Sequence, residues 1–148
     1  MTAIRETTAS CTQVWDVIAD GWTYSQWVVG NSRMRAVSAD WPAEGSTIHH
    51  SIGVWPAVIN DKTVVERCRP KREVVLLAKL GPFGAARITL RLEDAGDGCR
   101  IVMHEVPVSG PLALIPKPIA LVALLPRNRE CLWRLASLAE RRTPDELD

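Results

Sequence analysis

Between residues 33 and 106, strand-like segments follow one another with turn-like connections and no helical pattern between them. The clearest is Ala85–Glu93, in which apolar side chains alternate with Arg87, Thr89 and Arg91. A period of two is typical of a strand with one buried and one solvated face. Because short turns join consecutive strands into antiparallel meanders, this region restricts the chain to folds built on an antiparallel sheet.

Six strands are expected in this region. They span Arg33–Ser38, Thr47–Val54, Lys62–Arg69, Glu73–Leu80, Ala85–Glu93 and Cys99–Val106. Residues that favour turns separate several of them, namely Asp40–Gly45, Pro70-Lys71, Gly81–Gly84 and Gly96-Asp97-Gly98. A further strand, Ala3–Ser10, precedes them, which makes seven in all.

Two short helices are expected after the first strand. The first spans Cys11–Ala19, with Ser10 as its N-cap and an apolar face centred on Val14 and Ile18. Asp20-Gly21 would end it, with Gly21 in the left-handed conformation. The second, Trp22–Val28, is rich in aromatic residues, which indicates burial.

The last third of the chain predicts one long helix. A crossing loop over Pro107–Lys117 leads into a helical pattern over residues 118–142. The predicted buried stripe is Leu121, Leu125, Asn128, Leu132, Leu135 and Ala139. This stripe stays in phase across Pro126, so we favour a single helix kinked at Pro126 over two separate helices.

The composition indicates one globular domain. The chain has 148 residues, a length typical of one domain. Its net charge of +1 gives no indication that it binds nucleic acid or a membrane surface. No signal segment opens it, and the apolar stretch Leu112–Leu125 is too short for stable membrane insertion. The four cysteines show no metal-site spacing. We therefore expect reduced thiols, a cytoplasmic location and a single domain over residues 1–148, ordered over about 3–142.

Together these elements define an α+β fold, a curved seven-stranded antiparallel sheet wrapped on a long C-terminal helix. The apolar face of such a sheet needs a cover, and only the long helix is large enough. Sheet and helix would leave a cavity between them.

Several motifs in this order resemble the SRPBCC, or START-like, superfamily of helix-grip proteins, which includes bacterial polyketide cyclase/dehydrase and lipid transport proteins. The motifs are Val14–Asp20, Gly53–Pro56, Glu105–Pro111 and Arg127–Glu130. The resemblance covers about residues 3–142, and it implies a hydrophobic cavity that holds a lipid, a polyketide or another apolar ligand. The chain departs from its relatives at Cys11, where they commonly have proline, and at Pro126.

The residues expected to line this cavity come from the second helix, the sheet and the long helix. They are Trp27, Met34, His50, Trp55, Val64, Glu66, Ile88, Met103, Glu105, Leu125, Asn128 and Leu132.

Three of these residues are candidates for acid–base chemistry. Glu105 shares its parity with Ile101 and Met103, so it would face the cavity, where a carboxyl group suits proton transfer. The alternative, which we favour, is a structural carboxylate paired with an arginine. Glu66 has the same ambiguity. His49 and His50 point to opposite faces of one strand, so only one of them, expected to be His50, can reach the cavity.

Asn128 is the one polar residue on the predicted helix stripe. A buried amide needs hydrogen-bond partners, so it would either tie the helix to the sheet or orient a ligand. The sequence predicts no metal site and no cofactor.

Two functions follow from these expectations. The first is non-catalytic binding of a hydrophobic small molecule (lipid, fatty acid or polyketide-like) between the sheet and the helix. The alternative is a polyketide aromatase/cyclase-like enzyme that uses the cavity carboxylates and histidine. The apolar stretch Leu112–Leu125 additionally predicts a possible homodimer or a partner surface.

Overall fold

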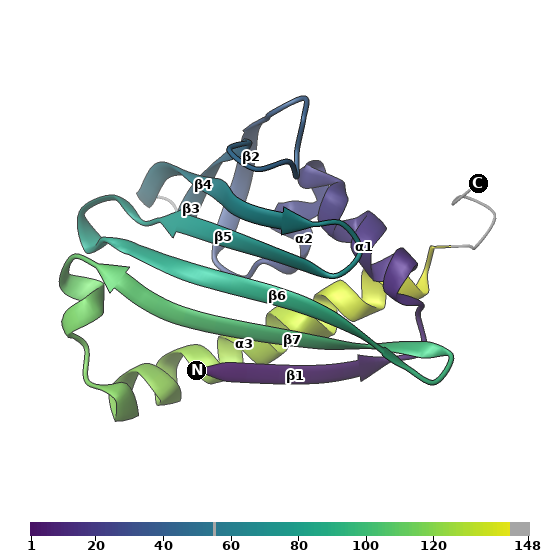
Figure 1. Cartoon of the computed structure of the whole chain (residues 1–148). Coiled ribbons are helices and arrows are strands. Elements are labelled where there is room, and N and C mark those ends of the chain that lie inside the picture. Colours follow the sequence, from purple (N-terminus) through teal and green to yellow (C-terminus); the bar gives the residue numbers. More distant parts are fainter. Residues whose placement is uncertain (55, 143–148) are drawn as a thin grey trace.

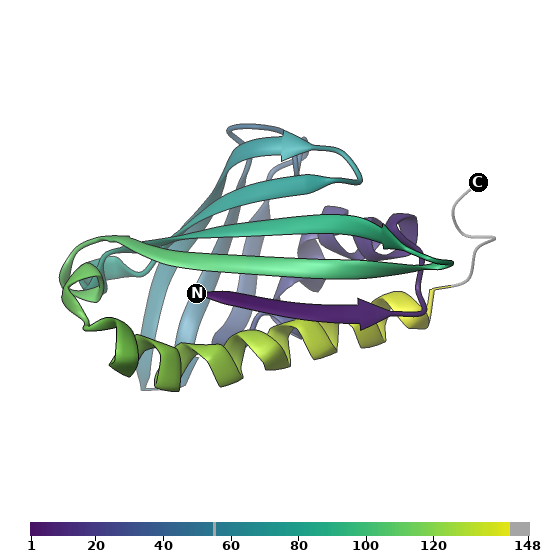
Figure 2. The ribbon, with the colours of Figure 1, turned by 60° about the horizontal axis from the view of Figure 1, so that its bottom comes forward.

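The computed structural model describes residues 1–54 and 56–142, and its described part has the predicted helix-grip architecture. A seven-stranded antiparallel sheet has the strand order β1-β7-β6-β5-β4-β3-β2. The strands curve, and the long helix α3 runs below them with its C-terminal half beside α1 (Figure 1). Figure 2, turned toward this side, shows α3 along the length of β1. Helix α3 contacts β1, β7, α1 and α2.

The strands of the sheet are β1 Thr2–Thr7, β2 Asn31–Val37, β3 Thr47–Val54, β4 Ala57–Arg69, β5 Glu73–Lys79, β6 Ala85–Ala95 and β7 Gly98–Ser109. The α-helices are α1 Cys11–Ala19, α2 Tyr24–Trp27 and α3 Lys117–Glu140. Three single-turn 3-10 helices are η1 Gly21–Thr23, η2 Gly81–Phe83 and η3 Pro111–Leu114. The strand β4 begins earlier and β7 ends later than predicted.

Helix α1 spans Cys11–Ala19 as the sequence predicted, but the backbone after it differs from the prediction. The Ser10 side chain accepts a hydrogen bond from the Gln13 backbone, and the Gln13 side chain accepts one from the Ser10 backbone, which completes a capping box. The left-handed conformation expected for Gly21 is wrong, because Gly21 opens η1 without a positive φ. Its position instead requires a small residue, since a Cβ there would lie 2.6 Å from Val37 Cγ1.

Strand β4 contains a bulge that changes which side chains face the core. The register with β5 shifts between Val65 and Arg67. Thr63 and Val65 are buried, whereas Glu66 and Arg67 are both exposed. The strict alternation assumed for this strand placed Val64 and Glu66 on the inner face, and that placement is wrong because a bulge adds one residue and inverts the parity.

Helix α3 is a single helix that contains Pro126, as predicted. Its buried residues from Asn128 onward follow the predicted stripe through Leu132, Leu135 and Ala139. The first half does not follow it. Leu121 is 44% exposed, and the buried residue in that half is Ala120.

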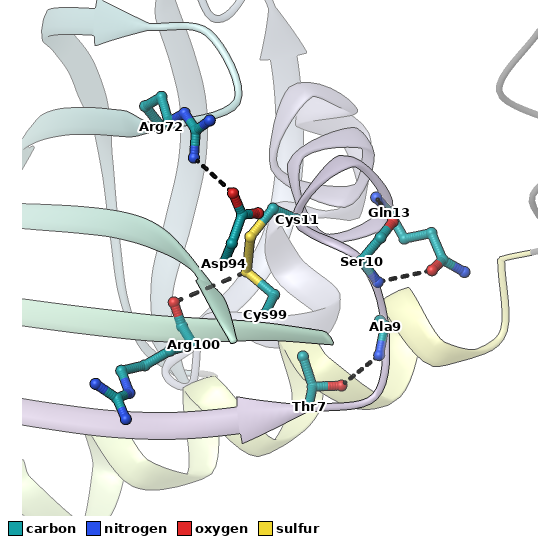
Figure 3. Close-up of a disulfide and its surroundings, with 9 residues drawn as sticks. All are labelled: Thr7, Ala9, Ser10, Cys11, Gln13, Arg72, Asp94, Cys99 and Arg100. Carbon is teal, nitrogen blue, oxygen red and sulfur yellow. Dashed lines mark hydrogen bonds and ion pairs between the residues drawn. A yellow bond between two sulfur atoms is a disulfide. The ribbon is translucent and has the colours of Figure 1, made fainter. Parts of the chain in front are cut away.

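The core extends from α1 and α2 across the inner face of the sheet to the second half of α3. Val14, Val17, Ile101 and Leu135 are completely buried in it. At this end of the molecule the β6–β7 turn lies beside the start of α1 (Figure 1). The Cα atoms of Cys11 and Cys99 are 5.0 Å apart there, and the two residues form a disulfide (Figure 3).

The disulfide overturns the expectation that every cysteine is reduced. Cys11 and Cys99 are separated by 88 residues in the sequence. Spacing alone cannot show that the fold brings them together. The expected cytoplasmic location rested on reduced thiols, so it loses that argument. Cys68 and Cys131 are free, and Cys131 is buried.

Candidate functional site

A partly open chamber of about 160 Å³ lies between the inner face of the sheet, α2 and the first half of α3. It is lined by Tyr24, Val28, Val29, Gly30, Asn31, His50, Ile52, Thr63, Ala78, Leu80, Ala86, Ile88, Glu105, Leu112, Leu124 and Arg127. Most of these side chains are apolar. The polar ones form two groups, one carried by β2, β3, β4 and α2 and the other by β7 and α3.

The first polar group is centred on His50. Its Nε2 atom lies 2.8 Å from Thr63 Oγ1, which in turn lies 3.5 Å from the Tyr24 hydroxyl oxygen. The imidazole also stacks on the Tyr24 ring with a centroid distance of 5.9 Å. Burial lowers the pKa of His50 to about 4, with Arg35 and His49 acting in the same direction and Asp61 opposing them. The imidazole is therefore neutral at pH 7.

The second polar group is an ion pair. Glu105 is buried, and its Oε2 atom lies 3.4 Å from Arg127 Nη1. Arg127 also donates to the Val29 carbonyl at 3.0 Å and to Asn128 Oδ1 at 3.0 Å. The guanidinium thus links α3 to the segment after α2 and neutralises the carboxylate. Glu105 lines the chamber, and it also has an arginine partner, Arg127.

An apolar groove of about 730 Å³ adjoins the chamber. Ile52, Leu80 and Leu112 line both spaces, so the two are neighbours. The rest of the groove comes from the β3–β4 turn, η2 and η3, and includes Val58, Phe83, Pro111 and Ile115. The groove is more open than the chamber and gives it an apolar entrance.

The structure divides the predicted cavity residues into four sets. His50, Ile88 and Glu105 line the chamber. Val64 and Glu66 lie on the outer face, where Glu66 pairs with Arg87 at 3.0 Å. Trp55 lies outside the described residues. The remaining six pack in or against the core without lining the chamber, namely Trp27, Met34, Met103, Leu125, Asn128 and Leu132.

Asn128 is completely buried and makes internal contacts. Its Oδ1 atom accepts from Arg127, and its Nδ2 atom lies 3.9 Å from Met1 Sδ. Of the two alternatives left open by the sequence, these contacts agree with a tie inside the protein.

Sequence reasoning missed Tyr24, Thr63 and Arg127. Tyr24 was identified as a buried aromatic residue but not placed at the cavity. Thr63 alternates with Val65 before the bulge, so correct parity would have identified it. Arg127 follows Pro126, and a charged residue beside the apolar stripe signals a buried partner, which here is Glu105.

Two features of the described residues bear on other classes of function. Within residues 1–54 and 56–142, no three His, Cys, Asp or Glu side chains gather as a metal site would require. Across the same ranges, no helix is both long and apolar enough to span a membrane.

Comparison with known proteins gives structural likeness only. No protein-family model and no curated protein matches the sequence. The di-domain ARO/CYC StfQ from the steffimycin biosynthetic pathway matches with a TM-score of 0.73 and 9% identity, over 96% of this chain and 50% of that chain. DynU16, from the dynemicin biosynthetic locus, matches with a TM-score of 0.68 and 14% identity, over 97% of this chain and 48% of that chain.

A third solved structure has nearly the same length as this chain. Protein NE0264 from Nitrosomonas europaea matches with a TM-score of 0.72 and 10% identity, over 97% of this chain and 95% of that chain. At such identities the likeness concerns the fold. These structures confirm the helix-grip fold that the sequence predicted, and this chain shares that fold with StfQ and DynU16.

Proposed function

We propose that this protein binds a hydrophobic small molecule, with one end of the ligand in the chamber and the remainder in the adjoining groove. The observation that carries this proposal is that the two spaces share Ile52, Leu80 and Leu112 as walls. A chamber of about 160 Å³ is comparable with a cavity of about 150 Å³ that holds one benzene molecule. The groove provides room for a larger ligand, in the range typical of small-molecule sites.

The ligand class follows from the lining. Apolar contact would supply most of the affinity, at about 25 cal/mol per Å² of buried apolar surface before the costs of association. The few polar groups would orient the ligand. A lipid, a fatty acid or a polyketide-like molecule fits this description.

Native mass spectrometry of the protein purified from its own host tests the proposal. We expect a small apolar molecule to remain bound. A variant with a filled chamber, Ala78→Leu, should lose most of it, because Ala78 is buried and lines the chamber. Ala36→Leu, an exposed site on β2, is the matched control. Equal retention by both variants would contradict binding in this chamber.

A second candidate is an aromatase/cyclase-like enzyme, favoured by one observation. A carboxylate, Glu105, and an uncharged histidine, His50, line the same chamber. Such a pair could move protons while the chamber holds a flexible chain in position. The test is the mass of the molecule recovered from the wild type and from Glu105→Gln. A product released by the wild type and an unaltered precursor retained by the variant would establish catalysis, and identical molecules would exclude a role for Glu105.

Self-association stays a prediction. Leu114 and Val122, both from the stretch expected to form a partner surface, are 83% and 80% exposed. Sedimentation analysis at micromolar and at higher protein concentration would measure it.

A further inference from the structure

The wall of the chamber contains two buried polar atoms that no described residue satisfies. They are His50 Nδ1 and Asn31 Oδ1. Both residues line the chamber, from the neighbouring strands β3 and β2. A buried polar atom without a hydrogen bond is costly and therefore rare in folded proteins. Two such atoms on one wall indicate that a ligand supplies the missing partners.

The His50 side chain is held in place, and Nδ1 is the ring nitrogen that has no hydrogen-bond partner among the described residues. Only 2% of the residue is exposed. Thr63 occupies its Nε2 atom at 2.8 Å, and the ring stacks on Tyr24. The Arg35 guanidinium donates to the His50 carbonyl at 3.3 Å, which holds the backbone of the same residue. A hydrogen bond and a stacked ring hold the imidazole, and a third contact holds the backbone that carries it. The remaining nitrogen therefore points in one direction, as a recognition group requires.

Asn31 is held less firmly. Its Nδ2 atom lies 3.8 Å from Met34 Sδ, a weak acceptor. Its backbone is paired with Ile52, two residues beyond His50 on β3.

We propose that the group bound at this wall is a hydroxyl on an uncharged ring, hydrogen-bonded to His50 Nδ1 with Asn31 as its second partner. This inference rests on the proposed ligand-binding function. A hydroxyl both donates and accepts a hydrogen bond, whereas a ketone or an ether oxygen only accepts. A hydroxyl therefore suits the imidazole in either tautomer and the amide in either orientation.

The rest of the chamber opposes a charged ligand. The imidazole is neutral at pH 7, so it offers no charge to an anion. Among the described residues, the cation on the chamber wall is Arg127, and it already binds Glu105, Asn128 and Val29. An anionic ligand near Arg127 would also approach the Glu105 carboxylate, and like charges repel strongly away from water. The volume of about 160 Å³ limits this part of the ligand to a single ring.

Three small probes of similar size separate these properties, namely phenol, toluene and benzoate. We would measure their dissociation constants at pH 7.5 by isothermal titration for the wild type, His50→Phe and His49→Phe. His50→Phe replaces the imidazole with an apolar ring that fills a similar space. His49 is the matched control, because it is the neighbouring histidine on the opposite face of β3 and does not line the chamber.

The expected result is a change in the ratio of phenol to toluene affinity. One hydrogen bond corresponds to about a tenfold change in affinity. His50→Phe should therefore lower the ratio about tenfold, while toluene still binds. His49→Phe should leave the ratio unchanged. Asn31→Leu should lower it by a smaller factor, and it provides an independent variant if His50→Phe does not fold.

Three outcomes would overturn the inference. An unchanged ratio in both His50→Phe and Asn31→Leu would show that these atoms do not recognise the hydroxyl. Benzoate binding more tightly than phenol would show that the site selects an anion. Both of these results would leave the proposed binding function intact, because toluene would still occupy the chamber. If neither phenol nor toluene binds the wild type, the proposed binding function fails together with this inference.

Discussion

The second half of α3, residues 128–140, is packed along its inner side, whereas the first half, residues 117–127, leaves large apolar side chains in solvent. Leu135 is completely buried, and Val122, on the same helix, is 80% exposed. We call the region around α1, the β6–β7 turn and the second half of α3 the packed end. The chamber, the groove and the first half of α3 form the open end. The difference shows that this fold concentrates its tightly packed core at one end and the chamber and groove at the other.

The disulfide provides the largest test of this comparison, because it lies at the packed end. In a chain-entropy model, a link that closes a loop of 88 residues stabilises the fold by about 4.6 kcal/mol. Reduction should lower the melting temperature by about 10 °C. Thermal unfolding with and without a reducing agent measures this shift. The variant Cys11→Ser/Cys99→Ser should melt at the lower temperature under both conditions, and a reductant effect that persists in it would show that other thiols are responsible.

Truncating a core side chain is the next largest test. Leu135→Ala should reduce the free energy of unfolding by about 3 kcal/mol, because it removes buried methyl groups and leaves a cavity. Val122→Ala, in the exposed half of the same helix, should change it by less than about 0.5 kcal/mol. Urea unfolding of the two variants gives both values. Similar losses in both would mean that the first half of α3 is covered in solution.

The pH dependence of stability tests the open end, through His50. Its pKa is lowered to about 4 in the folded protein, against about 6.5 in an unfolded chain. Between these values the unfolded state binds more protons, so stability falls as the pH falls from about 6.5 toward 4. The loss between pH 7.5 and pH 5 should be about 2 kcal/mol.

Urea unfolding of the wild type and His50→Gln at both pH values isolates this contribution from the other titrating groups. His50→Gln should lack the part of the stability loss that comes from protonation of His50. An equal pH dependence of the free energy of unfolding in the two proteins would show that the pKa of His50 is not lowered in the folded protein.

The smallest effect on stability is expected at the groove. Phe83 is 54% exposed and lines the groove, so Phe83→Ser should change the free energy of unfolding by less than about 0.5 kcal/mol. It should nevertheless weaken binding of an apolar fluorescent probe, N-phenyl-1-naphthylamine, by about fivefold through lost apolar contact. Trp133→Ser is the matched control, because Trp133 is also half-exposed but does not line the groove. A similar loss of binding in both variants would place the probe elsewhere.

The same two ends differ in how far the sequence predicted them. The packed end follows from local patterns: the capping box at Ser10, the face of α1 and the stripe from Asn128 to Ala139 are all periodic. The disulfide is an exception, since pairing across 88 residues depends on the finished fold. The strand order could be predicted because short turns leave few alternatives for consecutive strands.

The open end depends on features that break periodicity. Strict alternation through β4 predicts Glu66 on the inner face, but the strand has a bulge between Val65 and Arg67. In the structure Thr63 is buried and Glu66 is exposed. The spacing predicts a buried Leu121, but Leu121 is 44% exposed and the buried residue in the first half of α3 is its neighbour Ala120. Cavity walls are also hard to distinguish from core by pattern alone, because both are apolar. For that reason the sequence pattern assigns Met103 and Leu132 to the cavity wall. The structure places both in the core.

Asn128 shows how a structure changes an experiment. The sequence leaves open that Asn128 orients a ligand, and in that case Asn128→Leu would change ligand choice more than stability. The Asn128 side chain accepts a hydrogen bond from Arg127 and does not line the chamber. We therefore expect Asn128→Leu to lower the free energy of unfolding, with little direct effect on ligand choice.

Pro126 gives this architecture a kinetic consequence. Proline has no backbone N–H, so the carbonyl of Val122 lacks its helical hydrogen bond, at a residue already open to water. The helix is therefore weakest where its two halves meet, and the first half can open while the second stays in place. We expect amide hydrogens of residues 119–125 to exchange faster than those of 130–139. Leu124 of this segment lines the chamber, so the residence time of the proposed ligand would depend on how often the segment opens.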